Sequence, residues 1–255
     1  MKDMSSTSRV GLITGASSGL GEATARQLAR EGFTVILAAR RAALLNELVS
    51  EITQANGAAH AIPTDMTQPT QIEALAKQAL QQFGRVDVLV NNAGVSEQVQ
   101  AYEASDEQIE FIMRTNFTSA VQLTRALVPQ MLARGSGHVI NVASVLGHLA
   151  VPMVSLYSAS KHALRAWNDS LRRELRSTGV RISLVSPGFI RTAMTEGIRA
   201  PMPGPEAVAN AISGLIRRPK REVFVPGIYR LTAWAEAVAP GVMDWALTKI
   251  RREVI

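Results

Sequence analysis

The stretch Thr14-Gly15-Ala16-Ser17-Ser18-Gly19-Leu20-Gly21 decides the fold, because it joins the first apolar run of the chain to the first helical pattern. Its three glycines remove side chains where a backbone must approach a pyrophosphate, and the following helix directs N–H groups and its positive dipole end at that anion. A glycine-rich turn alone is only a turn, but this position in a strand–turn–helix unit predicts a dinucleotide site. The spacing Gly-x-x-x-Gly-x-Gly differs from the common Gly-x-Gly-x-x-Gly.

Apolar runs and helical patterns alternate along the rest of the chain. The runs span residues 10–14, 34–38, 58–62, 86–90, 138–142 and 180–185, and a short seventh run spans 223–225. The helical patterns lie near residues 21–30, 42–55, 71–83, 106–133 and 155–177. Ser105 and Gln108 form a capping-box pattern before the fourth of them. We expect an α/β fold: a Rossmann-type doubly wound parallel sheet of about seven strands with helices on both faces.

Length and composition favour a single dinucleotide-binding and catalytic domain over residues 1–255. Residues 189–205, rich in proline and glycine, predict a substrate lid, and residues 227–255 predict a C-terminal helical extension. The chain has no cysteine, which excludes disulfides, thiol nucleophiles and thiolate zinc sites, and we assign no metal ligands. With no signal-peptide run and no apolar span, we expect a cytoplasmic protein. The net charge of +6 comes with basic clusters, which are interpreted as solvated faces of the protein, and we expect no nucleic-acid partner.

Tyr157 and Lys161 are the clearest candidates for chemistry. They lie four residues apart in a helical pattern, so both side chains can point into one site. A cation within about 4–6 Å lowers the pKa of a phenol by roughly 1–3 units, which brings the phenol toward use as an acid or base near neutral pH.

Together these residues resemble the short-chain dehydrogenase/reductase family, in its single-domain branch. The resemblance rests on Thr-Gly-x-x-x-Gly-x-Gly followed by Tyr-x-x-x-Lys, and it covers nearly the whole chain. Further matches, in order, are Asp65, Asn91-Asn92-Ala93-Gly94, Asn116, Ser144 at 13 residues before Tyr157, and Pro187-Gly188.

The resemblance implies an enzyme that interconverts a carbonyl and an alcohol. Tyr157 would transfer a proton to or from the substrate oxygen and Ser144 would hydrogen-bond that oxygen. Lys161 would lower the phenol pKa and bind the nicotinamide ribose, and Asn116 would hold a water for a proton relay. The implied cofactor-binding residues are Gly15, Ser17, Ser18, Gly19, Leu20, Gly21, Arg40, Arg41, Asp65, Met66, Asn92, Ala93, Gly94, Tyr157, Lys161, Pro187, Gly188, Ile190 and Thr192. The family resemblance also implies a homodimer or homotetramer.

The end of the second strand favours NADP(H) over NAD(H). NAD enzymes usually place an acidic residue there to accept from the ribose 2′-OH. By resemblance to the family that position is Ala39, which would not repel a 2′-phosphate, and Arg40 follows with paired donors that suit a phosphate.

The substrate is specified less clearly. Our candidate substrate residues are Ser144, Leu146, Tyr157, Phe189 and Met194. The apolar ones favour an apolar or bulky carbonyl compound as the substrate. The alternative is that these apolar side chains merely pack the lid. A 3-oxoacyl-thioester reductase, a non-catalytic NADP-binding sensor and an epimerase on the same scaffold are the alternatives. His148 is interpreted as a surface-loop histidine, with substrate contact as its alternative.

The C-terminal extension has apolar residues at helical spacing, including Trp234 and Trp245, and a basic end. We expect it to pack on its own domain or on a second subunit. Peripheral contact with a membrane surface is the alternative, because tryptophan and basic residues also suit that interface.

Overall fold

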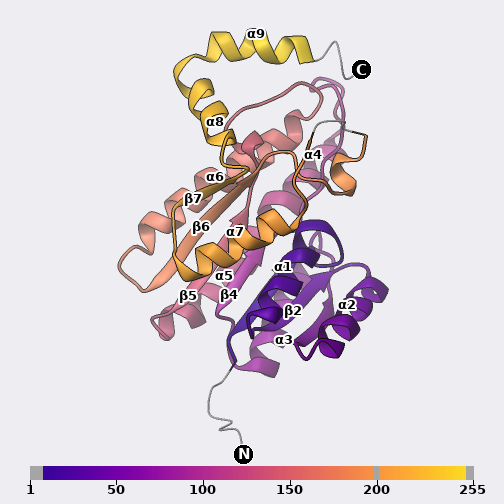
Figure 1. Ribbon diagram of the computed structural model, residues 1–255, viewed down its shortest axis with the longest axis vertical. Helices are drawn as coiled ribbons and strands as arrows, with labels where there is room; N and C mark the ends of the chain where they lie inside the picture. Colours follow the sequence, from indigo (N-terminus) through magenta and orange to yellow (C-terminus); the bar gives the residue numbers. More distant parts are fainter. Residues whose placement is uncertain (1–7, 198–200, 251–255) are drawn as a thin grey trace, which may run out of the picture.

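The computed structural model describes residues 8–197 and 201–250 (Figure 1). Within these residues a seven-stranded sheet has the order β3-β2-β1-β4-β5-β6-β7, with every neighbouring pair parallel. The strands are β1 (Val10–Thr14), β2 (Thr34–Ala39), β3 (Ala58–Pro63), β4 (Val88–Asn91), β5 (Gly137–Val142), β6 (Val180–Pro187) and β7 (Glu222–Val225). The strand order reverses between β1 and β4, and sheets of this kind bind ligands outside the carboxyl ends of such strands.

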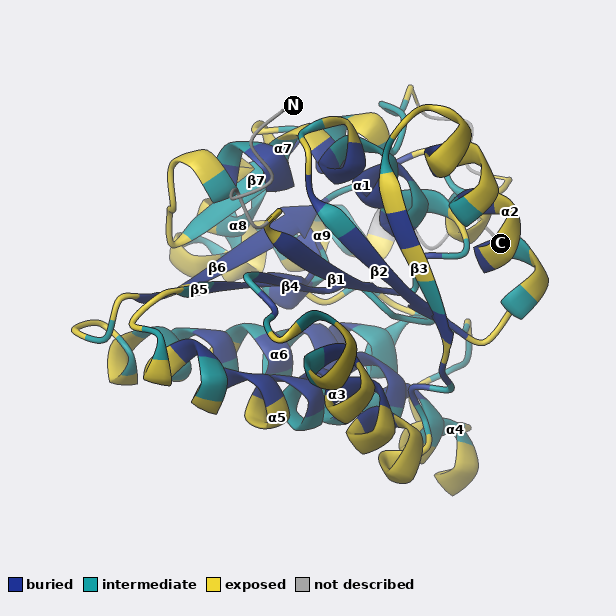
Figure 2. Cartoon of the chain, turned by 90° about the horizontal axis from the view of Figure 1, so that it is seen from below, coloured by how far each residue is buried: buried dark blue, intermediate teal, exposed yellow. Residues whose placement is uncertain are grey.

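Helices cover both faces of this sheet (Figure 2). One face carries α1 (Gly19–Arg30), α2 (Ala42–Gln54) and α7 (Glu206–Arg217). The other carries α3 (Pro69–Phe83), α4 (Asp106–Met113), α5 (Ser119–Ala133) and α6 (Ser155–Glu174). The predicted Rossmann-type doubly wound fold is therefore confirmed.

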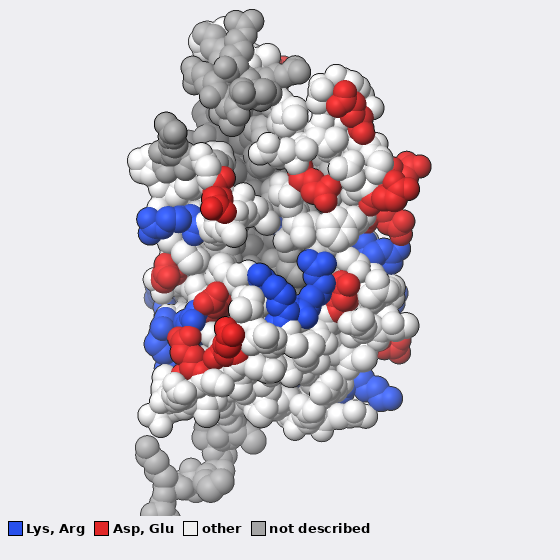
Figure 3. All heavy atoms as spheres, turned by 90° about the vertical axis from the view of Figure 1, so that its right-hand side faces the viewer, with Lys and Arg blue, Asp and Glu red and all other residues white. Residues whose placement is uncertain are grey.

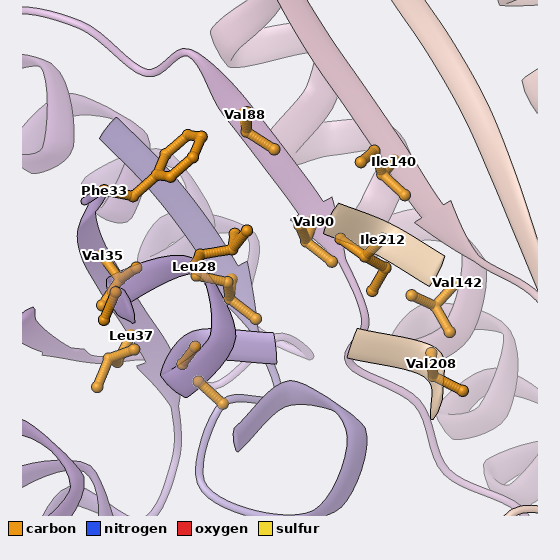
Figure 4. Packing of buried hydrophobic residues seen from close by; sticks show 14 of the residues in the cluster. Leu28, Phe33, Val35, Leu37, Val88, Val90, Ile140, Val142, Val208 and Ile212 are labelled. Atoms are coloured by element: carbon orange, nitrogen blue, oxygen red, sulfur yellow. The ribbon is translucent and has the colours of Figure 1, made fainter. Parts of the chain in front are cut away.

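Apolar side chains on both faces of the strands hold these layers together. Successive residues of a strand point to opposite faces, so Ile13 packs on the side of α1 and Leu12 packs on the side of α3 and α5. Figure 4 shows part of the first cluster, where Leu28 of α1 and Ile212 of α7 lie over the sheet and Ile140 comes from β5. The central strands are buried on both faces and are therefore almost continuously apolar, which is why the sequence pattern predicted them, whereas the edge strand β3 is partly exposed.

Some boundaries differ from the expected ones. β4 begins at Val88 rather than at residue 86, and β6 continues to Pro187. The helix expected over 106–133 is divided, because a π-helical turn at Arg114–Thr118 separates α4 from α5. The capping box is confirmed: Ser105 Oγ accepts from the Gln108 N–H at 3.3 Å, and the Gln108 side chain accepts from the Ser105 N–H at 3.0 Å.

The segment predicted as a lid, 189–205, is irregular apart from a short 3₁₀ turn at Ala193–Thr195, and residues 198–200 within it lie outside the described part of the chain. Its two ends are tied together, since the Arg191 N–H donates to the Pro203 carbonyl at 2.9 Å.

The helical C-terminal extension is confirmed as far as Ile250, and residues 251–255 of the predicted segment lie outside the described chain. α8 (Tyr229–Val238) and α9 (Pro240–Ile250) stand away from the sheet at one end of the molecule (Figure 1). Large apolar side chains are exposed along both helices: Ile228, Leu231, Trp234, Val238, Val242 and Trp245. Of the helices in the described residues, none has the length and apolar character needed to cross a bilayer.

His138 is a buried histidine of β5, and its ring contacts Ser183 of the neighbouring strand β6. Ser183 donates its hydroxyl hydrogen to the Lys220 carbonyl at 2.6 Å, so the His138 Nε2–H is the donor in its 2.9 Å contact with Ser183 Oγ. Burial lowers the pKa of His138 from 6.5 to about 4, and the positive charge of Arg181 adds to this effect. The folded protein therefore holds a neutral imidazole at pH values where the unfolded chain binds a proton.

We expect His138 to make stability depend on pH between 6.5 and about 4. The unfolded state takes up a proton below pH 6.5, so the free energy of unfolding falls as pH drops through this window, by up to about 3 kcal/mol. Urea unfolding at several pH values should show a shallower decline in His138→Gln. His60→Gln, at an exposed histidine, is the matched control. Identical pH slopes in the unchanged protein and in His138→Gln would rule out this role.

Candidate active site

A cleft of about 440 Å³ opens at the carboxyl ends of β1 and β4, where the strand order reverses. Most of the residues singled out in the sequence line it: Gly15, Ser17, Ser18, Gly19, Leu20, Arg40, Arg41, Asp65, Met66, Asn92, Ala93, Gly94, Ser144, Tyr157, Lys161, Pro187, Gly188, Ile190, Thr192 and Met194. Four of them are not in its lining: Gly21, Asn116, Leu146 and Phe189.

The glycine-rich loop between β1 and α1 forms a bare backbone wall of the cleft. Gly15 and Gly19 have φ angles of 65° and 57°, which favour glycine. A Cβ on Gly21 would lie 2.3 Å from the Gly15 carbonyl oxygen, so only glycine lets α1 begin this close to the loop. The cradle left by these missing side chains, with the N-terminus of α1 behind it, fits the pyrophosphate of a dinucleotide.

Thr14, which begins the glycine-rich motif but was given no role of its own, connects this loop to the end of β4. Its hydroxyl oxygen accepts from the N–H groups of Asn92 and Ala93, each at 3.0 Å. Asn92 in turn donates through Nδ2 to the Thr14 carbonyl at 2.8 Å. These bonds fix the two strand ends at the cleft.

The end of β2 brings basic side chains to the cleft. The Arg41 guanidinium donates to Ser17 Oγ at 3.0 Å and to Ser18 Oγ at 2.7 Å, so it lies across the glycine-rich loop, while Arg40 is exposed at the rim. Figure 3 shows basic side chains beside a hollow on this side of the molecule. Of the described residues that line the cleft, only Asp65 is acidic, and its Oδ1 accepts from the Thr67 N–H and hydroxyl, each at 2.9 Å.

Ser144 and Tyr157 meet at the floor of the cleft. Their side chains interact, and Ser144 is buried. Ser144 Oγ also accepts from the Leu146 N–H at 3.1 Å and lies 3.4 Å from the Pro187 carbonyl, to which it donates. Two hydroxyl oxygens therefore lie at one point of the cleft. The Tyr157 O–H there, and the Ser144 O–H once it turns from the Pro187 carbonyl, could stabilise an oxygen that becomes negatively charged.

Lys161 lies one helical turn after Tyr157 on α6. Its ammonium donates to the Val142 carbonyl at 3.0 Å and is 5.6 Å from the centre of the Tyr157 ring. Burial lowers the pKa of Lys161 to about 8. The predicted lowering of the phenol pKa by Lys161 does not hold in this structure. Burial raises the pKa of Tyr157, and only the interaction with Ser144 lowers it. Lys161 does not lower the phenol pKa here, because a buried lysine is itself less readily charged.

Asn116 is buried in the π-helical turn and faces the same group of residues. Its Oδ1 accepts from the Val95 N–H at 2.8 Å, and its Nδ2 donates to the Val95 carbonyl and to Ser160 Oγ, each at 2.9 Å. Ser160, which the sequence analysis missed, donates to the Tyr157 carbonyl at 2.7 Å. Asn116 is thus linked to the helix that carries Tyr157 and Lys161, and its predicted hold on a relay water stays a prediction.

The expected substrate residues are spread over the open end of the cleft. Met194 lines the cleft and is 53% exposed, Phe189 is 48% exposed outside the lining, and Leu146 is half-buried. The Phe189 ring lies edge-on to Tyr229 of α8, with ring centres 6.5 Å apart. A Cβ on Gly188 would lie 2.0 Å from the Tyr229 ring, so α8 packs directly on the loop after β6. This contact was not foreseen.

Within the described chain, no group of three or more His, Asp or Glu side chains could hold a metal ion.

Comparisons with known proteins agree with this geometry. Residues 9–203 match the family model described as short chain dehydrogenase. The chain is 41% identical to the ketoacyl reductase HetN of Nostoc sp. over 226 residues, which cover 86% of this chain and 79% of that protein. A metagenomic short-chain oxidoreductase solved in complex with NADP is 34% identical, with a TM-score of 0.77 over 85% of this chain and 96% of the other. A short-chain dehydrogenase/reductase from Burkholderia phymatum in complex with NAD is 26% identical, with a TM-score of 0.87 over 92% and 95%.

Gly21→Ala should weaken dinucleotide binding without unfolding the protein. The new Cβ would have to displace the Gly15 backbone, and strain of about 2 kcal/mol at the loop corresponds to a loss of affinity of at least about tenfold. Fluorescence titration with NADPH measures this. Gly214→Ala is the matched control, since that glycine lies in α7 with open space around its Cβ position. Equal affinities for the two variants would contradict the proposed cradle.

Proposed function

Because the chain belongs to the short-chain dehydrogenase family and is therefore an oxidoreductase that acts on CH–OH groups, we propose that it interconverts a carbonyl compound and an alcohol with NADP(H) as the hydride carrier. The observation that carries this proposal is the contact between Ser144 and Tyr157 at the floor of the cleft, with Lys161 buried beside them. A non-catalytic sensor would need none of this arrangement.

Residues of this chain would manage the charge and the proton of the reaction. When bound, the cofactor would supply a hydride to the carbonyl carbon, so that negative charge would develop on the carbonyl oxygen. Tyr157 gives its proton to that oxygen while Ser144 donates a hydrogen bond to it. The phenol of Tyr157, whose pKa burial raises, carries at neutral pH the proton that reduction requires. Lys161, with its pKa lowered to about 8, can exchange protons in the same range and restore the phenol.

NADP(H) is the proposed cofactor, and NAD(H) is less favoured. Arg40 and Arg41 stand at the end of β2 beyond Ala39, where an acidic residue would accept from the ribose 2′-OH of NAD. Arg41 already lies across Ser17 and Ser18, which leaves Arg40 at the rim as the freer donor to a 2′-phosphate. One similar structure holds NADP and another holds NAD, so the support for NADP(H) comes from Arg40 and Arg41 of this chain.

Arg40→Asp should reverse the cofactor preference. A charge-assisted hydrogen bond contributes about 1.5–3 kcal/mol, so the loss in NADPH affinity should be at least about tenfold, while affinity for NADH should hold or rise. Binding titrations with both nucleotides measure the ratio. Arg218→Asp, at an exposed residue after α7, controls for the change in net charge. If the unchanged protein binds NADH more tightly than NADPH, the cofactor proposal is wrong.

The proposed substrate is an apolar or bulky carbonyl compound, reduced to its alcohol. Support comes from the apolar side chains at the open end of the cleft, which are Leu146, Phe189 and Met194, and from Tyr229 beside them. A 3-oxoacyl thioester is the second candidate, because a relative that is 41% identical carries the name ketoacyl reductase.

A screen of ketones of graded size against 3-oxoacyl thioesters, followed by NADPH consumption, tests both candidates. We expect the apolar ketones to be reduced. Activity confined to the thioesters would replace the first candidate by the second, and no NADPH consumption with any carbonyl compound would contradict the proposed function.

The same assay tests the role of Tyr157. Tyr157→Phe keeps the ring and removes the proton, so turnover should fall by at least about 10²-fold, the usual scale for lost acid–base catalysis, with NADPH affinity unchanged. Tyr102→Phe is the matched control, since Tyr102 is 81% exposed and outside the cleft. Near-normal turnover of Tyr157→Phe would exclude the phenol from the reaction.

We propose a cytoplasmic homodimer or homotetramer in which the extension packs on a second copy of the chain. Support comes from the exposed apolar side chains of α8 and α9, which one copy leaves in solvent. Light scattering should give a multiple of 27.5 kDa for the full chain and a lower mass for the double variant Leu231→Glu, Trp234→Glu. An unchanged mass, with flotation on liposomes that the double variant loses, would instead favour contact with a membrane surface.

A further inference from the structure

The loop that follows Ser144 is anchored at its far end by a cluster of three side chains that the proposed mechanism does not use. His148 Nε2 donates to Glu222 Oε1 at 2.6 Å, and the Ser186 hydroxyl donates to the same oxygen at 2.5 Å. The His148 and Glu222 side chains are 14% and 13% exposed, and Ser186 is fully buried. The expectation that His148 is a surface-loop histidine is therefore wrong, because a carboxylate of β7 draws its ring inward.

The near end of the same loop is Ser144. Residues 145–147 form a short 3₁₀ turn, with Ser144 as its N-cap and His148 as its C-cap. Ser144 Oγ accepts from the Leu146 N–H and donates to the carbonyl of Pro187, the residue directly after Ser186. Ser144, before the turn, is thus bonded directly to Pro187 of β6. His148, after the turn, is bonded through Glu222 of β7 to the neighbouring residue Ser186.

The turn has little freedom between these two ends. A Cβ on Gly147 would lie 2.9 Å from the Lys161 carbonyl oxygen, and the Arg165 guanidinium donates to the Gly147 carbonyl at 2.9 Å. The Phe224 ring lies 5.1 Å from the His148 ring, centre to centre. A turn packed this closely moves as one body, so a displacement of His148 would be passed on to Ser144.

We propose that His148, Glu222 and Ser186 form a positioning clamp that sets the Ser144 hydroxyl against Tyr157. None of the three lines the cleft, so they act through the turn and not on the substrate. A carboxylate can only accept hydrogen bonds, and in a largely buried site its two donors define its place closely. The expected effect of the clamp on turnover rests on the proposed reductase function, whereas its expected effect on the mobility of the turn does not.

A double-mutant cycle tests the kinetic consequence. His148→Leu should lower kcat by about tenfold, a typical result of slight misplacement of a catalytic group, with NADPH affinity unchanged. His148→Gln keeps an N–H donor and should recover most of that loss. In a Ser144→Ala background, His148→Leu should lower kcat by less than about a further twofold, because the effects of coupled residues are not additive. Equal losses in both backgrounds would overturn the proposal that the clamp acts through Ser144. His60→Leu is the control at an exposed histidine.

Hydrogen exchange tests the structural consequence whether or not a substrate is found. Peptides that cover residues 144–148 should exchange at least about tenfold faster in His148→Leu, because the turn loses its anchor, while peptides from α3 should not change. Unchanged exchange at the turn would overturn the clamp itself. Faster exchange in a protein that reduces no carbonyl compound would support the clamp and contradict only the proposed reaction.

Discussion

The burial of Lys161 beside Tyr157 is the constraint on which the site depends. An ammonium group inside a protein is costly unless it has partners. Here it donates to the Val142 carbonyl, and burial lowers its pKa to about 8 without removing its charge at neutral pH. Gly94 borders the same space at short range. A Cβ there would lie 3.3 Å from the ammonium and 3.4 Å from Asn116 Oδ1. The π-helical turn that carries Asn116 completes the same enclosure.

The sheet brings these parts together from distant positions in the sequence. β1 ends in the glycine-rich loop, β4 in Asn92 to Gly94, β5 just before Ser144, and β6 in Pro187. Parallel strands place all these ends along one edge, so the proposed acid–base residues and the backbone cradle share one cleft. Thr14 adds the local bond that holds the first two ends in register.

Several features were predictable because they repeat locally or because the resemblance carried them. Strands buried on both faces appear as apolar runs, and the four-residue spacing of Tyr157 and Lys161 places them on one side of a helix. Contacts between segments far apart in the chain left no such signal: Tyr229 against Gly188, Ser160 with Asn116, and His148 with Glu222. The direction of the Tyr157 pKa was also out of reach, because it follows from burial rather than from the nearby lysine.

In the proposed reaction, a hydride reaches a carbonyl carbon while Tyr157 supplies the proton. The most direct measurement is a single turnover with NADPH deuterated at C4 of the nicotinamide, followed by mass spectrometry of the alcohol. One deuterium is expected on the carbinol carbon of the product, and none at that carbon when the label is placed in the solvent instead. Label that enters that carbon from the solvent, or an alcohol formed without loss of NADPH, would contradict it.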